Sequence, residues 1–492
     1  MLLIGVDIGT SSTKGVLVDE SGRIIASHLV FHSVNRPQPT WAEQDADQVW
    51  WGGFVAVVRS LMSQAPKRSK IAGIGVSGTC PTLLPVDYNG KPLRPGILYS
   101  IDRRAIEEIN EINSKVGPKE ILESSGNVLS TQCIGPKMLW LMRHEPQLYK
   151  RTKWFLGTNG YVVLRLTGVA CWDHFSAGDG GYGYDFSNCK WDVDALNRMG
   201  IDFSLLPQLR WSTELVGTVI SDAARETGLP EGTPVIAGVG DAAAEMVSTG
   251  VIEDGSLVLL YGSSLVTMSS VRKPYVSSGF ILTPGLEPDN YFVSSVLGTG
   301  CALIEWLRNV LNWNDRVPDY DLLENEAMLV KPGSNDLIII PYLTGQRSPE
   351  VNPNMFGAIL GINQSHTFGH LYRASLEGMA FALRYSLSKL EKAGLLKDYE
   401  IVAGGGGSKS ELWTQIVTNV CRREQKLISG SVQAPIGSAF LAGKAVGIFS
   451  SENLKKWVTY QKTIRVQKNM ADIYDHSYGL FMKYLGLLAQ NI

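Results

Sequence analysis

The first nineteen residues constrain the fold more than any other stretch of the chain. Residues 2–6 and 15–19 are rich in aliphatic and β-branched side chains, which is typical of strands. The turn between them contains Gly9, three hydroxyl side chains and Lys14. Backbone N–H groups, hydroxyls and one cation gathered at a turn suit a chain of phosphates, and Asp7 beside it could hold the accompanying Mg²⁺. An ordinary β-hairpin could carry the same residues, so both interpretations stay open at this point.

The length and composition limit the class of protein. A chain of 492 residues is too long for one ordinary core and predicts two large domains or three smaller ones. A net charge of −2 gives no bulk field that would attract nucleic acid or an anionic membrane. The six cysteines are scattered without C-x-x-C spacing, so we expect neither a disulfide framework nor a zinc site. No signal segment or membrane-spanning stretch is evident, and a cytoplasmic location is expected.

Patterns of strands and helices alternate along the chain and favour an α/β architecture. Strands are predicted at residues 71–76, 234–240, 337–341 and 400–403. Helices are predicted at residues 45–63, 242–247 and 370–392, with residues 137–166 mostly helical and residues 173–185 forming a loop.

A second strand-turn-strand pattern occurs at residues 256–271, with Gly262, Ser263 and Ser264 at its turn. It lies about 250 residues after the first pattern and indicates two related domains, each with a hydroxyl-bearing phosphate turn. The repeat is faint and does not prove duplication by itself. We expect the domains to span residues 1–248 and 249–492.

A run of four glycines, residues 404–407, lies between a predicted strand and a predicted helix. Glycines at such a junction let the backbone approach a flat or anionic ligand, and the following helix offers free N–H groups. The sequence has no G-x-x-x-x-G-K-[ST] motif, so it is not a P-loop NTPase. Two G-x-G-x-x-G matches, at residues 73–78 and 178–183, are expected by chance among 51 glycines.

Asp241 is the most informative single residue, because it follows an apolar strand at the edge where an α/β sheet presents its ligand-binding groups. An acid there is costly unless it has a role, although Asp is also a common helix N-cap. One residue could serve both purposes. His366 and His370 have the spacing of metal ligands on a helix, but the sequence offers no adjacent Glu and no evident third ligand. We therefore expect these histidines to be structural.

Several separated motifs resemble those of the FGGY carbohydrate kinases, a family within the wider group that shares the actin and Hsp70 ATPase fold. Residues 357–362 followed by residues 370–377 fit the second pattern of that family throughout. Residues 5–14, 262–264 and 403–413 resemble its two phosphate motifs and its adenosine motif. Residues 137–140 resemble the core of its first pattern. The resemblance covers essentially the whole chain.

Within the family, the chain is most similar to the xylulose-kinase-like branch. Residues 240–243, Gly-Asp-Ala-Ala, resemble the G-D-N-A of that branch, and residues 345–357 resemble its G-E-R-T-P…D-P…G. The resemblance implies two ribonuclease-H-like domains flanking a cleft, with sugar bound by residues 1–248 and nucleotide by residues 249–492. It implies ATP-dependent phosphorylation of a primary hydroxyl on a small sugar, ketose, polyol or sugar acid.

The resemblance also assigns roles to individual residues. Asp241 becomes the catalytic base, and Asp7 with Asp241 becomes the Mg²⁺ site. The expected ATP contacts are Thr10, Ser11, Ser12, Lys14, Ser263, Gly300, Glu305, Gly405, Gly406 and Ser410. The expected substrate contacts are Thr79, Cys80, Pro81, Asp102, Arg104 and Asp241. The implied partners are small molecules, ATP and a sugar, without nucleic acid or membrane, and a homodimer is compatible with the sequence.

The chain departs from the xylulose kinases at sugar-facing positions. Where they have S-G-Q-M-H-G, residues 77–82 read Ser-Gly-Thr-Cys-Pro-Thr, so the expected histidine is absent. Where they have W-x-D-x-R, residues 100–104 keep the acid and the arginine but lack the tryptophan, and Ala242 replaces the Asn after the catalytic acid. We expect D-xylulose to be a poor substrate unless backbone atoms or a water replace the lost side chain. Arg104 could pair with the carboxylate of a sugar acid.

A rival hypothesis is an actin-like or Hsp70-like ATPase that does not phosphorylate a sugar. Its phosphate turns would be the same, so they do not discriminate between the two. The match at residues 357–377 and the loops at residues 77–104 favour the sugar kinase.

Overall fold

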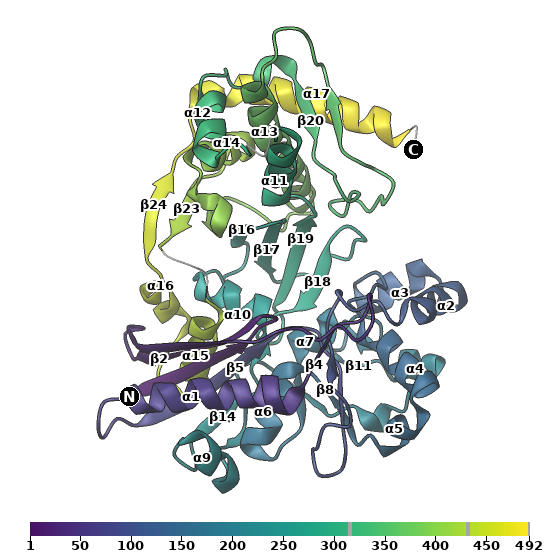
Figure 1. Ribbon diagram of the computed structural model, residues 1–492, viewed down its shortest axis with the longest axis vertical. Helices are drawn as coiled ribbons and strands as arrows, with labels where there is room; N and C mark the ends of the chain where they lie inside the picture. Colours follow the sequence, from purple (N-terminus) through teal and green to yellow (C-terminus); the bar gives the residue numbers. More distant parts are fainter. Residues whose placement is uncertain (313–316, 430–432, 491–492) are drawn as a thin grey trace.

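Two β-sheets organise the chain, one in each half (Figure 1). The computed structural model describes residues 1–312, 317–429 and 433–490. Within them the first-half sheet has seven strands, namely β13 (Leu215–Thr218), β14 (Pro234–Ile236), β5 (Ile71–Gly78), β1 (Leu2–Ile8), β2 (Ser12–Asp19) and β3 (Ile24–Phe31) in spatial order, with β15 (Val239–Gly240) also paired to β5. The second-half sheet has β18 (Ile281–Pro284), β19 (Tyr291–Leu297), β17 (Leu265–Val271), β16 (Leu257–Tyr261), β22 (Ile401–Gly404), β23 (Gln425–Ile428) and β24 (Tyr460–Ile464).

The centres of the two sheets have the same topology. β1 pairs antiparallel with β2, which pairs antiparallel with β3, while β1 and β5 are parallel. In the second half β16 pairs antiparallel with β17, which pairs antiparallel with β19, while β16 and β22 are parallel. The faint sequence repeat therefore corresponds to a repeated strand order and sense, and both expected hairpins form.

Alternation along β1 sends its side chains to two different layers. Leu2, Ile4, Val6 and Ile8 lie in one buried cluster with α1 (Gly52–Gln64) and α6 (Thr158–Thr167). Leu3 lies in another cluster, which holds α10 (Asp241–Ser248), α15 (Ala434–Ala445) and residues of the second-half sheet. The period of two therefore turns Asp7 toward the second half of the chain.

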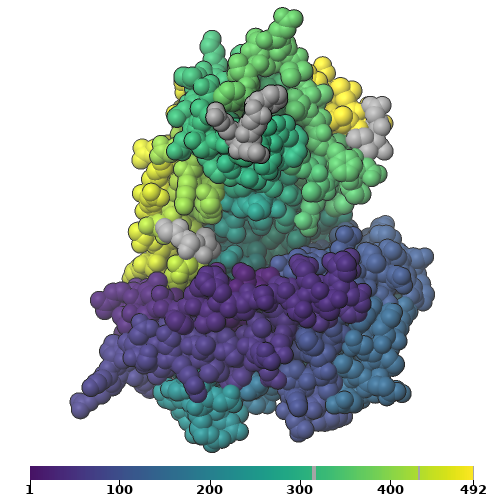
Figure 2. Space-filling model, viewed as in Figure 1, coloured from purple at the N-terminus to yellow at the C-terminus, as the bar shows by residue number. Residues whose placement is uncertain are grey.

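Helix α15 comes from the second half but packs on the first-half sheet, against β1 and β5, and on α10. Glycines make the close approach possible. A Cβ on Gly5 would lie 1.8 Å from the carbonyl oxygen of Pro435, and one on Gly75 would lie 2.0 Å from that of Ser438. In the space-filling view the second half rests on the first, with its late, yellow-green segments reaching down to the purple strands (Figure 2).

The remaining helices surround the two sheets. In the first half they are α2 (Ile106–Val116), α3 (Pro118–Ser125), α4 (Ile134–His144), α5 (Pro146–Arg151), α7 (His174–Asp179), α8 (Val193–Met199) and α9 (Ser221–Thr227). In the second half they are α11 (Cys301–Val310), α12 (Tyr320–Met328), α13 (Phe368–Lys392), α14 (Glu411–Cys421), α16 (Leu454–Trp457) and α17 (Ala471–Ala489). Two-stranded pairs are β4 (Glu43–Gln44) with β7 (Gly96–Ile97), β6 (Leu84–Val86) with β8 (Trp154–Leu156), β9 (Cys171–Asp173) with β12 (Gln208–Arg210), β10 (Tyr184–Asp185) with β11 (Lys190–Trp191), and β20 (Ile338–Ile340) with β21 (Ala358–Leu360).

The loop predicted at residues 173–185 is wrong for its first part, because residues 174–179 form α7. The Asp173 side chain accepts a hydrogen bond from the Ser176 N–H and caps this helix. Burial of residues 174–178 supplies the stabilisation that a helix of only 6 residues lacks on its own. The helix predicted at residues 45–63 begins with a π-helical turn at Ala46–Trp51 before α1. Among the described helices, none combines the length and apolar character that a bilayer crossing requires.

Candidate active site

Three acidic side chains gather where β1 and α10 meet between the halves of the chain. Asp7 pairs in register with Lys14 on β2 and with Ser77 on β5, and the Ser77 hydroxyl donates to its Oδ1 at 2.9 Å. Burial raises the pKa of Asp7, while the Ser77 hydrogen bond and the Lys14 charge oppose that rise. Asp7 is thus held rigidly at the end of a central strand, in a position set by the sheet register.

Asp241 is the first residue of α10 and follows β15 directly, as its sequence position predicted. Its Oδ1 accepts a hydrogen bond from the Ala242 N–H at 2.9 Å, so the side chain also satisfies a donor at the helix start. The residue is partly exposed, but the surrounding protein desolvates its carboxylate and raises the pKa well above its usual range. The charges of Asp7 and Glu245 raise that pKa further.

Glu245 is the third acid and was missed by the sequence analysis. It lies four residues after Asp241 on α10, a spacing that puts both side chains on one helix face. Burial and the charge of Asp7 raise the pKa of Glu245 to about 7, and the Lys14 charge opposes this. The Lys14 charge thus acts on both Asp7 and Glu245, within a group of acids that favours binding of a further cation.

The β1–β2 turn presents the predicted phosphate ligands at the same end of the sheet. The Gly9 N–H donates to the Ser12 carbonyl and closes the turn, while Thr10 is partly exposed and Ser11 is exposed. Ser12 is buried, with its side chain in the strand rather than at the tip. Thr10 also donates to the Tyr99 hydroxyl at 3.3 Å. The turn can therefore offer Thr10, Ser11 and Lys14 to an anion more readily than Ser12.

The second turn, at residues 262–264, is fixed to the start of α11 by backbone hydrogen bonds. The Gly300 N–H donates to the Ser263 carbonyl at 2.8 Å, and the Cys301 N–H donates to the Gly262 carbonyl at 2.9 Å. A Cβ on Gly300 would lie 2.7 Å from the Gly262 oxygen, so Gly300 has a packing role whatever it binds. Glu305, in the second turn of α11, is bonded to Arg308 and to the Tyr320 hydroxyl, each at 2.8 Å.

The glycine run has different neighbours at each position. Gly405 has φ +100°, and a Cβ there would lie 2.6 Å from the Tyr261 oxygen, so its conformation and its packing both require glycine. A Cβ on Gly406 would meet no atom within 4 Å, so this position opens on free space. Ser410 accepts from the Trp413 N–H and donates to Glu324, and it thereby caps α14. The structure gives Ser410 a capping role and leaves Gly406 as the position with room for a ligand.

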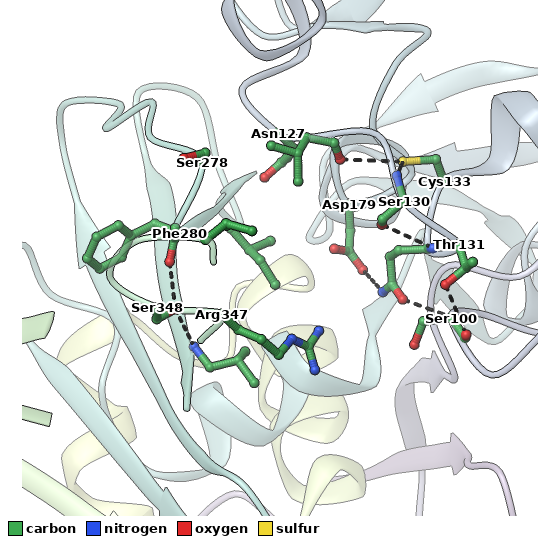
Figure 3. A pocket seen from close by; sticks show the side chains of 16 residues that line it. Ser100, Asn127, Ser130, Thr131, Cys133, Asp179, Ser278, Phe280, Arg347 and Ser348 are labelled. Atoms are coloured by element: carbon green, nitrogen blue, oxygen red, sulfur yellow. Dashed lines mark hydrogen bonds between the residues drawn. The ribbon is translucent and has the colours of Figure 1, made fainter. Parts of the chain in front are cut away.

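A cavity of about 310 Å³ lies between the two halves (Figure 3). Its first-half wall includes Ser100, Gln132 and Asp179, and its second-half wall includes Phe280 and Arg347. Figure 3 shows Asp179 on one side and the Arg347 side chain extending in from the other. Ligand pockets range from about 300 to 1,000 Å³, so this volume suits a small acceptor rather than a large one.

The predicted substrate residues at positions 79–81 lie beside this cavity but do not line it. Thr79 is buried and bonded to the Ile8 carbonyl at the end of β1. The Cys80 thiol donates to Asp179 Oδ2 at 3.8 Å, and a Cβ on Gly240 would lie 2.9 Å from Cys80. Pro81 is buried. Cys80 therefore lies between the residue that precedes Asp241 and the cavity wall.

The expectation that Asp102 and Arg104 face the substrate is not supported. Both side chains have 0% exposure, and Arg104 donates to Asp102 and to Glu43, each at 2.7 Å. The Arg104 guanidinium also lies 4.1 Å from the centre of the Trp41 ring. These contacts hold the pair inside the first half, because a buried ion pair needs its partners to offset desolvation. Of that segment, Ser100 reaches the cavity instead.

The two histidines have hydrogen-bond partners in neighbouring backbone. His370 Nδ1 is 3.2 Å from the Thr367 N–H and caps the start of α13. His366 Nδ1 accepts from the Asn363 N–H at 3.1 Å. In the described part of the chain, no group of three or more His, Cys, Asp or Glu side chains could by itself hold a metal ion.

Asp179, Gln132 and Arg347 were not singled out from the sequence. Arg347 lies in the segment 345–357 that matched a family motif, and that match was the available signal. Asp179 and Gln132 lie in unremarkable stretches, 47 residues apart, and only folding brings them together. No periodicity or spacing could have paired them.

Comparison with known proteins defines the class. The fold matches the crystal structure of xylulose kinase from Rhodospirillum rubrum with a TM-score of 0.93, at 27% identity, over 100% of this chain and 99% of that one. A xylulose kinase of Bacillus subtilis is 28% identical over 97% of this chain and 96% of its own length, and a gluconokinase of the same organism is 25% identical over 91% and 88%. The protein is thus a two-domain sugar kinase with the actin/Hsp70-type fold.

Family models identify it further. The N-terminal domain of the FGGY family of carbohydrate kinases matches residues 2–248, and the C-terminal domain matches residues 257–446. The chain belongs to the FGGY family of carbohydrate kinases. It is an ATP-dependent sugar kinase, as the resemblance implied, and the alternative of an actin-like ATPase without sugar phosphorylation is not favoured.

Proposed function

We propose that the enzyme transfers the γ-phosphate of ATP to a primary hydroxyl of a small ketose, polyol or sugar acid bound near Asp241. The observation that supports this most strongly is the position of Asp241, between the acid cluster at the end of β1 and, through Cys80, the cavity that Asp179 lines. The domain limits, residues 1–248 for the sugar and 249–492 for the nucleotide, are part of this proposal, although α15 packs on the first-half sheet.

Asp241 is the proposed general base. Its raised pKa makes it a better proton acceptor than an ordinary Asp, and its hydrogen bond from the Ala242 N–H holds it at the helix start. Phosphoryl transfer passes through a loose transition state, so orientation and charge stabilisation contribute more than base strength. Thr10, Ser11, Lys14 and Ser263 are the proposed phosphate contacts, and closure of the halves would exclude water as a competing acceptor.

Asp7 and Asp241 fit a magnesium ion. Mg²⁺ is usually held by one or two carboxylates together with substrate phosphates and water, so a complete protein cage is not required. Burial raises the pKa values of Asp7, Asp241 and Glu245, and the charge of Asp7 raises those of Asp241 and Glu245 further. A divalent cation would relieve this repulsion. The ion would neutralise charge on the transferring phosphate, while the protein residues orient the acceptor.

The acceptor is proposed to differ from D-xylulose. Relatives named xylulose kinase and gluconokinase share about a quarter of the sequence, so similarity alone does not select the acceptor. Proline at position 81 provides no side-chain donor or acceptor, and a pocket without that partner cannot demand the matching hydroxyl. The buried Arg104 also removes the main argument for a sugar acid.

The test is ADP release with a panel of xylulose, ribulose, erythritol and gluconate. We expect rapid release only with an acceptor, and we expect xylulose not to lead in kcat/KM. If xylulose leads by about tenfold or more, equivalent to ~1.4 kcal/mol, the substrate proposal is wrong. Equal ADP release with and without every acceptor would contradict sugar phosphorylation itself.

The cytoplasm is the proposed location, supported by six free cysteines with no disulfide. The homodimer stays a prediction, and sedimentation of the purified chain would check it.

A further inference from the structure

The cavity wall contains a negatively charged side chain that the proposed reaction does not use. Asp179 lies at the end of α7 and lines the cavity between the halves. Its Oδ2 accepts from Gln132 Nε2 at 2.8 Å and from the Cys80 thiol at 3.8 Å. Its Oδ1 has no hydrogen-bond partner among the described residues, so one oxygen is available to a ligand.

Gln132 fixes the orientation of this carboxylate. Its Oε1 accepts from the Ser100 N–H at 3.2 Å, which directs its Nε2 toward Asp179 and the Cys80 carbonyl. The amide group is therefore held at both ends, and Asp179 with it. A polar group held in this way can bind a hydroxyl without first losing side-chain entropy.

Asp179 lies beside the segment in which the expected histidine is absent. Cys80 and Pro81 stand where the xylulose kinases have Met and His, and Asp179 contacts Cys80. Burial raises the pKa of the Cys80 thiol well above its usual value, so the thiol stays neutral and donates weakly. The carboxylate is then the strongest hydrogen-bond acceptor on this wall.

The charges around Asp179 favour an uncharged ligand. Burial raises the pKa of Asp179 only to about 6, so it is ionised at pH 7.5, and Asp173 and Asp241 are further acids nearby. The buried Lys137 ammonium is bonded to the carbonyls of Leu98 and Tyr99. Arg347 lies on the opposite wall. A carboxylate placed against the first-half wall would therefore be repelled, whereas hydroxyl groups could donate to Asp179.

We infer that Asp179, positioned by Gln132, is the residue that selects the acceptor, binding neighbouring hydroxyls of an uncharged ketose or polyol and discriminating against sugar acids. This rests on the proposed function and specifies the substrate class of the same site. The reaction is unchanged, since the hydroxyls assigned to Asp179 are not the one that is phosphorylated.

The test compares Asp179→Asn with Asp194→Asn, the same change at an exposed acid of α8 that has no contact with the cavity. The acceptors are the neutral compound that the wild type uses best, its analogue lacking one hydroxyl, and gluconate. We expect Asp179→Asn to raise the KM for the neutral acceptor about tenfold or more, with the KM for ATP and the thermal midpoint unchanged. Loss of one hydroxyl from the acceptor should raise its KM by a larger factor in the wild type than in Asp179→Asn. Such a difference would show that the residue and the hydroxyl are coupled.

The outcomes separate the two proposals. If acceptors stimulate ADP release but Asp179→Asn keeps its KM within about twofold, or if gluconate is the best acceptor of the wild type, the inference is wrong and the kinase assignment stands. If no acceptor stimulates ADP release by the wild type, both the proposed function and the role of Asp179 are wrong. Should Asp179→Asn not fold, Gln132→Leu provides the test, because it frees the carboxylate and should raise the acceptor KM without altering the KM for ATP.

Discussion

The two halves of the molecule use one topology for different purposes. In the first half, the hairpin of β1 and β2 ends beside Asp7, with Asp241 and Glu245 on the neighbouring helix. In the second half, the equivalent hairpin of β16 and β17 is tied to α11 by backbone hydrogen bonds, and no acid precedes its turn. The same topology thus places acids beside the first hairpin and ties the second hairpin to a helix through backbone hydrogen bonds.

The difference shows where the protein accepts a cost in stability. Buried acids that repel one another destabilise the folded chain at neutral pH, because an acid whose pKa is raised on folding is harder to ionise there. Backbone bonds at the second turn carry no such penalty. The acids with raised pKa values are therefore beside the first hairpin, whereas the second hairpin is held by backbone hydrogen bonds.

Replacement of Asp241 by Asn tests the role of the acids beside the first hairpin, and it should have the largest effect. We expect kcat to fall by about 10²–10⁴, the usual cost of a lost general base. The thermal midpoint at pH 8 should stay equal or rise, because the variant removes one of the repelling charges. Rates and unfolding curves of wild type, Asp241→Asn and Asp194→Asn would check both expectations. Activity within a few-fold of wild type would refute the assignment.

A substitution at Gly5 tests how the two halves are joined. In Gly5→Ala the new Cβ would meet the backbone of α15, so we expect a loss of about 2–3 kcal/mol in unfolding free energy. The matched control is Gly479→Ala on α17, where a Cβ meets nothing within 4 Å and should stabilise the helix by about 0.5–1 kcal/mol. Denaturant unfolding would measure both. Equal stabilities would mean that α15 is not packed as described.

Substitutions in the glycine run at residues 404–407 test the second half of the molecule. Gly406→Val should raise the KM for ATP by about tenfold, or ~1.4 kcal/mol, without changing the acceptor KM or the stability, because only a ligand would occupy that space. Gly405→Ala should instead lower the thermal midpoint, since its Cβ would strike Tyr261 and its φ is +100°. Unchanged ATP affinity in Gly406→Val would mean that the glycine run forms a tight turn and does not contact the nucleotide.

The smallest effect concerns pH. The pKa of Asp179 is about 6, raised chiefly by burial and also by Asp173, and lowered by Gln132, Cys80 and Lys137. The carboxylate is charged above that pH and neutral below it, so the acceptor KM should rise about fourfold between pH 7.5 and 5.5. Asp179→Asn should have a high and flat KM over that range. Parallel profiles in both proteins would assign the titration to another group, such as Glu245.

The sequence by itself determined the class of protein and much of the fold. Local composition is enough to form a hairpin, so the strands on either side of Gly9 and of Gly262 were predicted correctly. Asp241 was found because a strand followed by a helix start defines one end of a sheet whatever surrounds it. Residues 174–179 were mispredicted as loop, since α7 depends on burial and on the Asp173 cap rather than on helix propensity.

Only the tertiary structure decided which polar residues reach the cavity. Asp102 and Arg104 have the residue types of a sugar site, but they are buried with Glu43 and do not line the cavity. Asp179 and Gln132 come from distant stretches of the first half and are brought together by its folding, and Arg347 shares their cavity because the two halves face each other. Charge and polarity are properties of a residue type, whereas burial and the direction of a side chain are set by everything packed around it.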